Sequence, residues 1–298
     1  MAVSESNAVV GPDEPPLVVK VGGARAVDPA GVIEDVAHVV ASGREVVVVH
    51  GGSTAVDDTL EALGEEPEYV ETPAGVSGRF TDEETLEVFS MVLPGKLNTE
   101  LVTDLRAAGV NAVGLSGVDG GLVTGSRKSA VRVVEDGKRK IRRGDHAGKP
   151  ESVNADLLGS LLADGYVPTV SPPMLADDGT AANADADRVA ALLAAEFGAE
   201  LVLLTDVEGV YEDPDDPETL IDEASTPAEF AAVEAAAEGF MSRKVHAAEE
   251  ALTGGAAGVV VSDAGLRKPL LAALAGHGTW IAPAAVTEPA EPAGGESA

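Results

Sequence analysis

Short runs of β-branched and apolar residues alternate along this chain with longer segments that have the period of an amphipathic helix. The apolar runs are LVVKVGG (17–23), EVVVVHGG (45–52), AVGLSG (112–117), VPTVSP (167–172), ELVLLTDVEG (200–209) and GVVVSDAG (258–265). The helical segments cover 29–42, 55–63, 82–108, 155–163, 186–197, 227–237 and 242–252. Because strands that alternate with helices usually pair in parallel through helical crossovers, this pattern predicts an α/β protein with a largely parallel sheet.

The two ends of the chain differ from the part between them. Residues 1–16 contain three prolines and no helical period, and residues 283–298 are rich in Pro, Ala, Glu and Gly, so we expect poorly ordered tails. The N-terminus has no basic start, and no run reaches the roughly 18 apolar residues of a membrane span. The absence of cysteine excludes disulfides and thiolate zinc sites. We therefore expect a cytoplasmic protein without a membrane partner.

The charge of the chain is strongly negative except in one segment. The 298 residues include 51 acidic and 20 basic ones, a formal net charge of −31, although 45% of the residues are hydrophobic. Acidic residues spread along a whole chain are typical of a halophilic host, because they keep the surface hydrated at high salt. Residues 127–149, however, hold nine basic residues against three acidic ones. In this segment we expect KRKIRR (138–143) on a strand or hairpin and GDHAGK (144–149) as the turn at its end.

Two of the apolar runs end in paired glycines before a predicted helix, in KVGGA (20–24) and HGGS (50–53). Glycines in this place allow the backbone to approach a ligand closely, and the start of the helix offers free N–H groups to an anion. Lys20 lies inside the first run, where a buried lysine requires an anionic partner. A tight turn and an internal ion pair explain the same residues, and neither GxxxxGK[ST] nor GxGxxG is present.

Charged residues also occur near the starts of two predicted helices in the second half of the chain. In NADAD (183–187), Asp185 or Asp187 is typical of a helix N-cap. In MSRKV (241–245), Lys244 is predicted in the first turn, where the positive end of the helix dipole disfavours a lysine unless an anion is near. Taken singly, each of these patterns has an ordinary structural explanation.

Taken together and in order, KVGGA, HGGS, GRFTDEETLEVFSMVLPGKLN (78–98), NADAD, LTDVEGVY (204–211) and MSRKV resemble the amino-acid kinase family, in particular acetylglutamate kinase and its carrier-dependent relatives. The resemblance covers about residues 17–282. It implies a three-layer αβα sandwich with two lobes: a substrate lobe at 17–178 and an ATP lobe at 179–282. The chain departs from the family in Ser53, where a third glycine is usual, and in Ala24, where serine is common.

The resemblance also implies roles for particular residues. Lys20 and Lys244 would stabilise the transferring phosphoryl group, and Asp187 would hold both lysines in place. The backbone amides of Gly51 and Gly52 would face the reacting groups, and Arg79 and Asn183 would bind the α-substituents of the substrate. The nucleotide would contact Gly22, Gly23, Thr205, Asp206, Gly209 and Tyr211. Phosphoryl transfer to a carboxylate depends on positioning and charge neutralisation, so we expect ATP, with Mg²⁺ bound to the nucleotide and no metal ligand from the protein.

The substrate loop indicates one branch of the family. GRFTDEETLEVF has Phe80 where we expect valine in kinases of free acetylglutamate. It resembles the branch that acts on glutamate or 2-aminoadipate joined to a small, acidic amino-group carrier protein, in arginine or lysine biosynthesis. The basic segment would then be the docking surface for this carrier, with Lys138, Arg139, Lys140, Arg142, Arg143 and Lys149. A solvated hairpin is the alternative, and a nucleic-acid site is disfavoured by the acidic background and the 3% aromatic residues.

Other functions stay open at this point. The chain could act as an acetylglutamate kinase on free substrate, or as a non-catalytic sensor that binds nucleotide. The presence of Lys20, Asp187 and Lys244 disfavours the sensor. Glutamate and aminoadipate differ by one methylene, which changes binding by only about 1–3 kcal/mol, so the sequence does not choose between them. The resemblance implies a homodimer, and the prolines in 1–16 argue against an N-terminal helix for arginine feedback.

Overall fold

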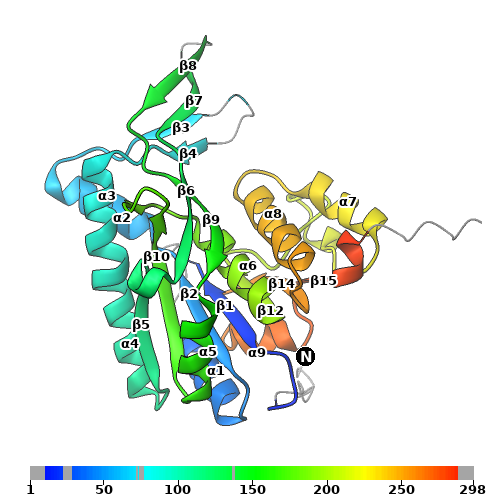
Figure 1. Cartoon of the computed structure of the whole chain (residues 1–298). Coiled ribbons are helices and arrows are strands. Elements are labelled where there is room, and N and C mark those ends of the chain that lie inside the picture. The colour runs from blue at the N-terminus through cyan, green and yellow to red at the C-terminus, as the bar shows by residue number, and fades with distance from the viewer. Residues whose placement is uncertain (1–10, 23–28, 72, 74–76, 136–137, 288–298) are drawn as a thin grey trace, which may run out of the picture.

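The computed structural model describes residues 11–22, 29–71, 73, 77–135 and 138–287. An 11-stranded sheet has helices packed on both of its faces (Figure 1). Its strands are β1 (Leu17–Val21), β2 (Val46–His50), β5 (Ala112–Gly117), β6 (Val123–Arg127), β9 (Gly148–Val153), β10 (Val167–Ala176), β11 (Ala181–Ala182), β12 (Glu200–Thr205), β13 (Glu223–Ala224), β14 (Gly258–Asp263) and β15 (Thr279–Ile281). Five of the six apolar runs each contain one of these strands, and the run at 167–172 is the first part of β10. In the described part of the chain, no helix is long and apolar enough to span a membrane.

The helices divide between the two faces of the sheet. The first face is covered by α1 (Pro29–Ala41), α4 (Asn98–Ala107) and α9 (Pro269–Leu274), and the second by α5 (Ala155–Ala163), α6 (Ala186–Phe197), α7 (Pro227–Ala236) and α8 (Phe240–Thr253). In β1, Val19 packs on the first face and Val18 on the second. Because strand side chains alternate, Lys20 points with Val18 toward the face of α6 and α8. The expected three-layer architecture with a largely parallel sheet is confirmed.

The order of the strands brings several carboxyl ends to one edge of the sheet. The order is β13-β15-β14-β12-β1-β2-β10-β6-β9, with β5 and β11 also paired to β10. β1 is parallel to both neighbours, so that Val21 lies opposite His50 on one side and Leu204 on the other. The chain leaves β1 for β2, whereas β12 lies on the opposite side of β1. In an open parallel sheet, such a reversal of direction creates a crevice at the carboxyl ends, where ligands bind.

The long helix predicted at 82–108 is divided into three parts. They are α3 (Glu83–Ser90), the π-helical segment η1 (Met91–Leu97) and α4. Pro94 lies within η1, and a proline inside a helix cannot donate the usual backbone hydrogen bond, so the helical hydrogen bonding is interrupted there. The regular apolar pattern of the sequence continues across this interruption, which explains why one helix was expected.

A separate hairpin stands above the sheet, beside the short strands β3 (Tyr69–Glu71) and β4 (Ser77–Arg79) (Figure 1). It consists of β7 (Ala130–Glu135) and β8 (Lys138–Arg143), so the strand expected for KRKIRR is present. The turn expected at GDHAGK is shorter than predicted: residues 144–147 lead from β8 to β9, and Gly148 begins β9. Within this connection Asp145 is 3% exposed and accepts hydrogen bonds from the backbone N–H groups of Thr81 and Ala147. Lys149 lies in β9, outside the hairpin.

Parts of both expected tails belong to the fold. The carbonyl oxygen of Pro15 accepts a 2.8 Å hydrogen bond from Nε of Arg44. At the other end, Pro283–Val286 form a short 3-10 helix, and Ala285 is buried because it packs against the core of the second face. The tails therefore cover fewer residues than expected, and the remaining parts, 1–10 and 288–298, lie outside the described residues.

Candidate active site

Lys20, Asp187 and Lys244 meet on the second face of the sheet, close to the end of β1. Nζ of Lys20 lies 2.7 Å from Oδ1 of Asp187, and Nζ of Lys244 lies 3.0 Å from Oδ2. None of the three residues is more than 8% exposed. One carboxylate therefore holds two buried ammonium groups, as the resemblance implied for these residues.

The local structure of α6 explains why Asp187 is available to the lysines. Asp185 is the N-cap, and its Oδ1 accepts hydrogen bonds from the backbone N–H groups of Asp187 (2.9 Å) and Arg188 (3.4 Å). Asp187 follows in the first turn, where the helix dipole favours a negative charge. The two interpretations of NADAD thus apply to different residues: Asp185 caps the helix and Asp187 binds the lysines.

Lys244 lies in the second turn of α8, so the prediction of a first-turn position is wrong. The helix begins at Phe240, after Gly239 with φ of 55°. Glycine adopts a positive φ at little cost, which allows the helix to start earlier than the sequence pattern indicated.

The three charges shift one another's pKa values. Burial by itself would lower the pKa of Lys20, but the Asp187 carboxylate outweighs this and raises the pKa above the ordinary lysine value. Burial and the charge of Lys20 lower the pKa of Lys244. Burial by itself would raise the pKa of Asp187, but Lys20 and Lys244 hold it at about 2. With both lysines protonated, the cluster carries one net positive charge, which favours an anion beside it.

The glycine pair after β2 has a more specific arrangement than expected. The N–H of Gly51 donates to the carbonyl oxygen of Val21 at 3.3 Å, so this amide joins β2 to β1 and does not face a ligand. Gly52 is the N-cap of α2 (Ser53–Leu63) and provides no side-chain cap. Its own N–H makes no hydrogen bond to any residue that the structure describes. Of the two predicted donors, only Gly52 is therefore available, next to the positive end of a helix dipole.

Arg79 lies beside the start of α2 and is held from several sides. Its Nη2 donates to the carbonyl oxygen (3.0 Å) and the hydroxyl (2.8 Å) of Ser53, and its Nη1 lies 2.5 Å from Oδ1 of Asp57. The guanidinium also lies over the ring of Tyr69, 5.3 Å from its centre. Asp57 and Tyr69 belong to no motif that predicts this contact. The only sequence signal for it is Ser53, in the place of a third glycine.

Asn183 connects the substrate loop to the base of the hairpin. Its Nδ2 donates to the hydroxyl of Thr81 at 2.9 Å, and its backbone N–H donates to the carbonyl oxygen of His146 at 2.8 Å. Thr81 in turn is bound by Asp145 through its backbone N–H. The residues between β8 and β9 are thus fixed to the end of the expected substrate site.

The residues expected to bind nucleotide follow the carboxyl end of β12. Thr205 is buried and donates from its hydroxyl to Asp206, which is exposed. The hydroxyl of Tyr211 donates to Glu208 at 3.0 Å. Gly209 is buried against Thr279, and a side chain there would collide with it, so packing alone explains this glycine. Gly22 is half-buried, and Gly23 lies outside the described residues.

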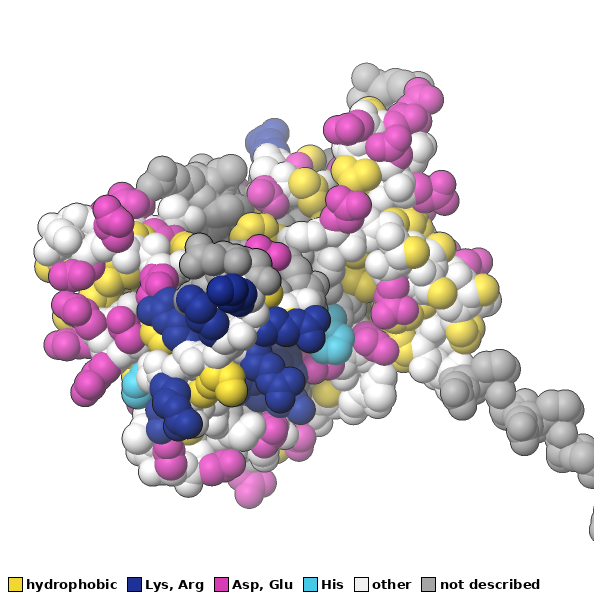
Figure 2. All heavy atoms as spheres, turned by 90° about the horizontal axis from the view of Figure 1, so that it is seen from above, with side chains coloured by type: hydrophobic (Ala, Val, Ile, Leu, Met, Phe, Trp, Pro, Cys, Tyr) yellow, Lys and Arg dark blue, Asp and Glu magenta, His cyan; other side chains and the backbone are white. Residues whose placement is uncertain are grey.

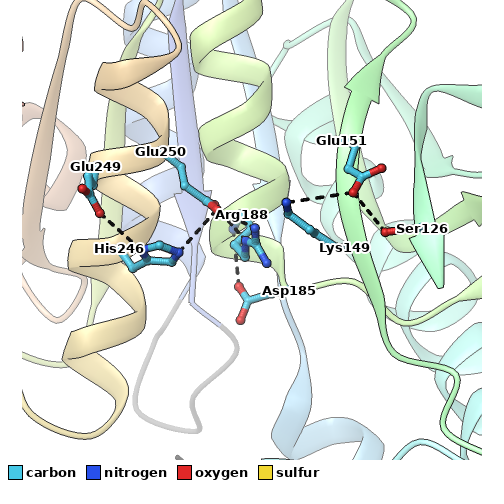
Figure 3. Close-up of polar contacts among 8 residues, drawn as sticks. All are labelled: Ser126, Lys149, Glu151, Asp185, Arg188, His246, Glu249 and Glu250. Carbon is cyan, nitrogen blue, oxygen red and sulfur yellow. Dashed lines mark hydrogen bonds and ion pairs between the residues drawn. The ribbon is translucent and has the colours of Figure 1, made fainter. Parts of the chain in front are cut away.

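Charged side chains join α6, which carries Asp187, to α8, which carries Lys244 (Figure 3). Arg188 of α6 donates two hydrogen bonds to Glu250 of α8, from Nε at 2.8 Å and from Nη2 at 2.5 Å. The ring of His246 lies between Glu249 (3.3 Å) and Glu250 (3.4 Å). A bidentate arginine–carboxylate pair fixes geometry as well as distance, so it helps to hold Asp187 and Lys244 together. Nothing in the sequence pattern indicated this contact.

A model of the amino acid kinase family matches residues 15–263, which is most of the chain. The chain therefore belongs to the amino acid kinase family, and the expected membership is confirmed. A protein of Deinococcus radiodurans named [LysW]-aminoadipate kinase is 46% identical over 266 residues, 89% of this chain and 91% of that one. An acetylglutamate kinase of Methanopyrus kandleri is 42% identical over 267 residues, 89% of this chain and 99% of that one.

The fold comparison agrees with this assignment. The structure of an N-acetylglutamate synthase from Neisseria gonorrhoeae, complexed with coenzyme A and N-acetyl-glutamate, aligns with a TM-score of 0.73. The sequence identity is 24%, and the alignment covers 90% of this chain and 59% of that one. The two proteins therefore share the fold of this domain.

Proposed function

We propose that this protein transfers the γ-phosphoryl group of ATP to the side-chain carboxylate of 2-aminoadipate or glutamate attached to an amino-group carrier protein. The observation that carries the proposal is the pair of buried lysines on Asp187, at the carboxyl ends of the central strands, where α2 also begins without a side-chain cap. The similarity to a protein named [LysW]-aminoadipate kinase supports the choice of acceptor. Lysine biosynthesis, or arginine biosynthesis with glutamate, is the corresponding pathway.

The geometry fits the demands of this transfer. A carboxylate oxygen of the acceptor attacks the γ-phosphorus, the bond from that phosphorus to the bridging oxygen breaks, and ADP leaves with an acyl phosphate as the other product. The acceptor is already ionised, so no residue has to remove a proton. Lys20 and Lys244 neutralise charge on the transferring group, and Asp187 keeps them oriented, which is the main contribution that a protein makes to phosphoryl transfer.

The remaining residues would position the two substrates. Gly22, Thr205, Asp206 and Tyr211 would hold ATP at the ends of β1 and β12, and Mg²⁺ bound to the nucleotide would neutralise phosphate charge. Among the described residues, no group of three or more His, Asp or Glu is arranged to hold a metal ion. Arg79 and Asn183 would bind the α-carboxylate and the linking amide of the carrier-bound amino acid.

The outer face of the β7–β8 hairpin is the proposed docking surface for the carrier. Residues opposite each other in an antiparallel pair share a face, and Val133, 1% exposed, lies on the face that is buried. That face also carries the exposed Lys138 and Lys140, so it is buried only around Val133. The other face presents Ile141, 68% exposed, surrounded by Arg132, Arg139 and Arg143. Viewed from above, basic side chains gather around this hairpin while acidic ones predominate over much of the remaining surface (Figure 2). An acidic partner with an apolar contact matches this surface.

Arg142 has a different role from its neighbours in the basic segment. It lies on the inner face, 4.3 Å from the centre of the Phe80 ring, and forms a bidentate pair with Glu68. It therefore fixes the hairpin to the substrate loop, and we assign carrier contact to Arg132, Arg139 and Arg143 instead. Because Asp145 joins the base of the hairpin to Thr81, a carrier on this surface would be adjacent to Asn183 and the expected substrate site.

Measurement of ADP formation with four acceptor conditions tests the proposal. The acceptors are carrier-linked aminoadipate, carrier-linked glutamate, free N-acetyl-L-glutamate and none, and the acyl phosphate is trapped as a hydroxamate. We expect product only with a carrier-linked amino acid. Equal turnover of free N-acetyl-L-glutamate would instead identify a free-substrate kinase, and nucleotide binding without any product would identify a sensor. A homodimer is part of the proposal, and light scattering of the purified protein checks it.

A further inference from the structure

His50, the last residue of β2, is 4% exposed and contacts a partner through each ring nitrogen. Its Nδ1 lies 2.9 Å from the carbonyl oxygen of Gly51, and its Nε2 lies 3.1 Å from Nδ2 of Asn98. The charged cluster does not involve this ring. It lies directly behind the glycine pair whose second amide is available at the start of α2.

The two contacts fix one tautomer of the ring. A carbonyl oxygen only accepts hydrogen bonds, so Nδ1 of His50 must carry the proton. Nδ2 of Asn98 also donates to the carbonyl oxygen of Thr169 at 2.8 Å, which identifies it as the nitrogen of that amide. Nε2 of His50 therefore accepts. Burial lowers the pKa of His50, which keeps the ring in the neutral form that these contacts require.

The hydrogen bond to Gly51 determines the direction of the next amide. In a planar trans peptide, the C=O of one residue and the N–H of the following residue point in opposite directions. When His50 holds the carbonyl oxygen of Gly51 on one side, the N–H of Gly52 must point to the other. This N–H makes no hydrogen bond to any residue in the described part of the chain.

The π-helical segment η1 packs against the Gly51–Gly52 peptide. A side chain at Gly52 would collide with Leu93 and Leu97 of η1, so the segment packs closely against the turn. Asn98 follows directly after η1 and is 4% exposed. Its Oδ1 occupies the space that a side chain at Gly114 would need, so the amide of Asn98 is confined as well. A π-helical turn within an α-helix frequently occurs at a functional site.

We propose that His50 and Asn98 are positioning residues: they orient the Gly51–Gly52 peptide so that the N–H of Gly52 donates to the transferring phosphoryl group. The inference rests on the proposed phosphoryl transfer and adds two residues that touch neither substrate. A preorganised donor stabilises a developing charge without reorganisation during the reaction, and here the preorganisation comes from a neutral histidine and an asparagine.

A pair of substitutions separates this role from simple packing. In His50→Asn, the side-chain amide replaces Nδ1 and keeps the donor to Gly51. In His50→Gln, the longer amide reaches the place of Nε2 and keeps only the contact with Asn98. We expect His50→Gln to lower kcat by about 10- to 100-fold, the scale of a small misplacement of a reacting group, with KM and ATP affinity little changed. His50→Asn should keep most of the wild-type kcat.

Two results with these variants would contradict a positioning role of His50. Equal losses of kcat in the two variants, at comparable melting temperatures, would mean that the ring only fills space. Wild-type kcat in His50→Gln would show that the bond to Gly51 is unimportant. If either variant fails to fold, the tautomer of the wild-type protein decides instead.

NMR of ¹⁵N-histidine-labelled protein measures this tautomer without any assay of activity. The His50 signals are those missing from the His50→Asn spectrum, or, if that variant does not fold, those assigned by through-bond correlation to the backbone. We expect the proton on Nδ1, although free neutral histidine prefers Nε2. A proton on Nε2 would overturn the inference. Absence of turnover with every acceptor would instead contradict the proposed function and leave the tautomer result standing.

Discussion

The lysine cluster and the β7–β8 hairpin both carry several positive charges, but those of the cluster are buried and those of the hairpin are largely exposed. In the cluster, two ammonium groups lie 2.7 and 3.0 Å from one carboxylate and are at most 8% exposed. On the hairpin, Arg139 and Arg143 are exposed and make no ion pair with a residue that the structure describes. Burial fixes the geometry of the first group and shields it from salt, whereas exposed charges beyond a few ångströms are screened at high salt. The cluster is therefore suited to chemistry and the hairpin to contact with a partner.

Removal of one lysine from the cluster should have the largest effect. Lys20→Ala or Lys244→Ala is expected to lower kcat by about 10²–10³, the scale of one lost preorganised donor, while ATP affinity falls less. Steady-state kinetics at saturating substrates measure this effect, with the exposed Lys268→Ala as the control. Wild-type kcat in either variant would remove that lysine from the mechanism.

Replacement of the shared carboxylate should weaken both activity and stability. Asp187→Asn leaves two buried ammonium groups without their counter-charge, and the loss of one partner from a buried ion pair costs about 3–5 kcal/mol of unfolding free energy. Asp185→Asn is the matched control, because asparagine is an equally good N-cap. Urea denaturation and kinetics of both variants test the difference. Similar small effects in the two variants would contradict the role of Asp187 as the shared counter-charge of the two lysines.

The stability difference between wild type and Asp187→Asn should depend on pH in a defined direction. The pKa of Asp187 is lowered to about 2 in the folded protein, compared with about 3.9 in an unfolded chain. Its charge therefore stabilises the fold fully above pH ~4, and this contribution is lost as the pH falls toward 2. Urea denaturation between pH 2 and 7 measures it. A difference that stays constant over this range would contradict the pKa shift.

Charge reversal on the hairpin should affect binding and leave the chemistry intact. Arg139→Glu combined with Arg143→Glu is expected to raise KM for the carrier-linked substrate by about tenfold, because contacts are lost and repulsion is added. The values of kcat and ATP affinity should stay near wild type. Arg267→Glu with Lys268→Glu on the distant α9 side changes net charge equally and is the control. An unchanged KM at the salt concentration of the host would leave the hairpin as a solvated element.

The smallest effect should come from the arginine that anchors the hairpin. Arg142→Ala removes a cation–π contact with Phe80 and a paired carboxylate, each of which contributes at most about 1 kcal/mol at an exposed site. Hydrogen exchange of β7 and β8 should become faster in this variant and not in Arg143→Ala. Equal exchange in both would assign no anchoring role to Arg142.

Two kinds of sequence pattern allowed prediction: runs of similar residues within one element, and motifs that follow one another in the order of a known family. The six apolar runs gave the central strands because β-branched residues repeat over several positions. Lys20, Asp187 and Lys244 were assigned through the order of motifs, and their contact depends on three elements far apart in the chain. The π-helical segment was missed, since its apolar pattern is the same as that of an α-helix. The bond from Gly51 to Val21 was also missed, because backbone hydrogen bonds between strand ends leave no mark on side-chain identity.

Asp145 fixes the base of the β7–β8 hairpin to the rest of the protein. Asp145 accepts hydrogen bonds from the backbone N–H groups of Ala147, next to it, and of Thr81, and the hydroxyl of Thr81 accepts one from Asn183. If the proposed carrier docks on the hairpin, these contacts would fix the distance from the carrier to the lysine cluster, and the attached amino acid would have to span that distance. The effective concentration of a tethered group is highest when its reach matches the span and falls when the tether is shorter or longer. The position of the hairpin would then favour those carriers whose attachment arm has the length of this span.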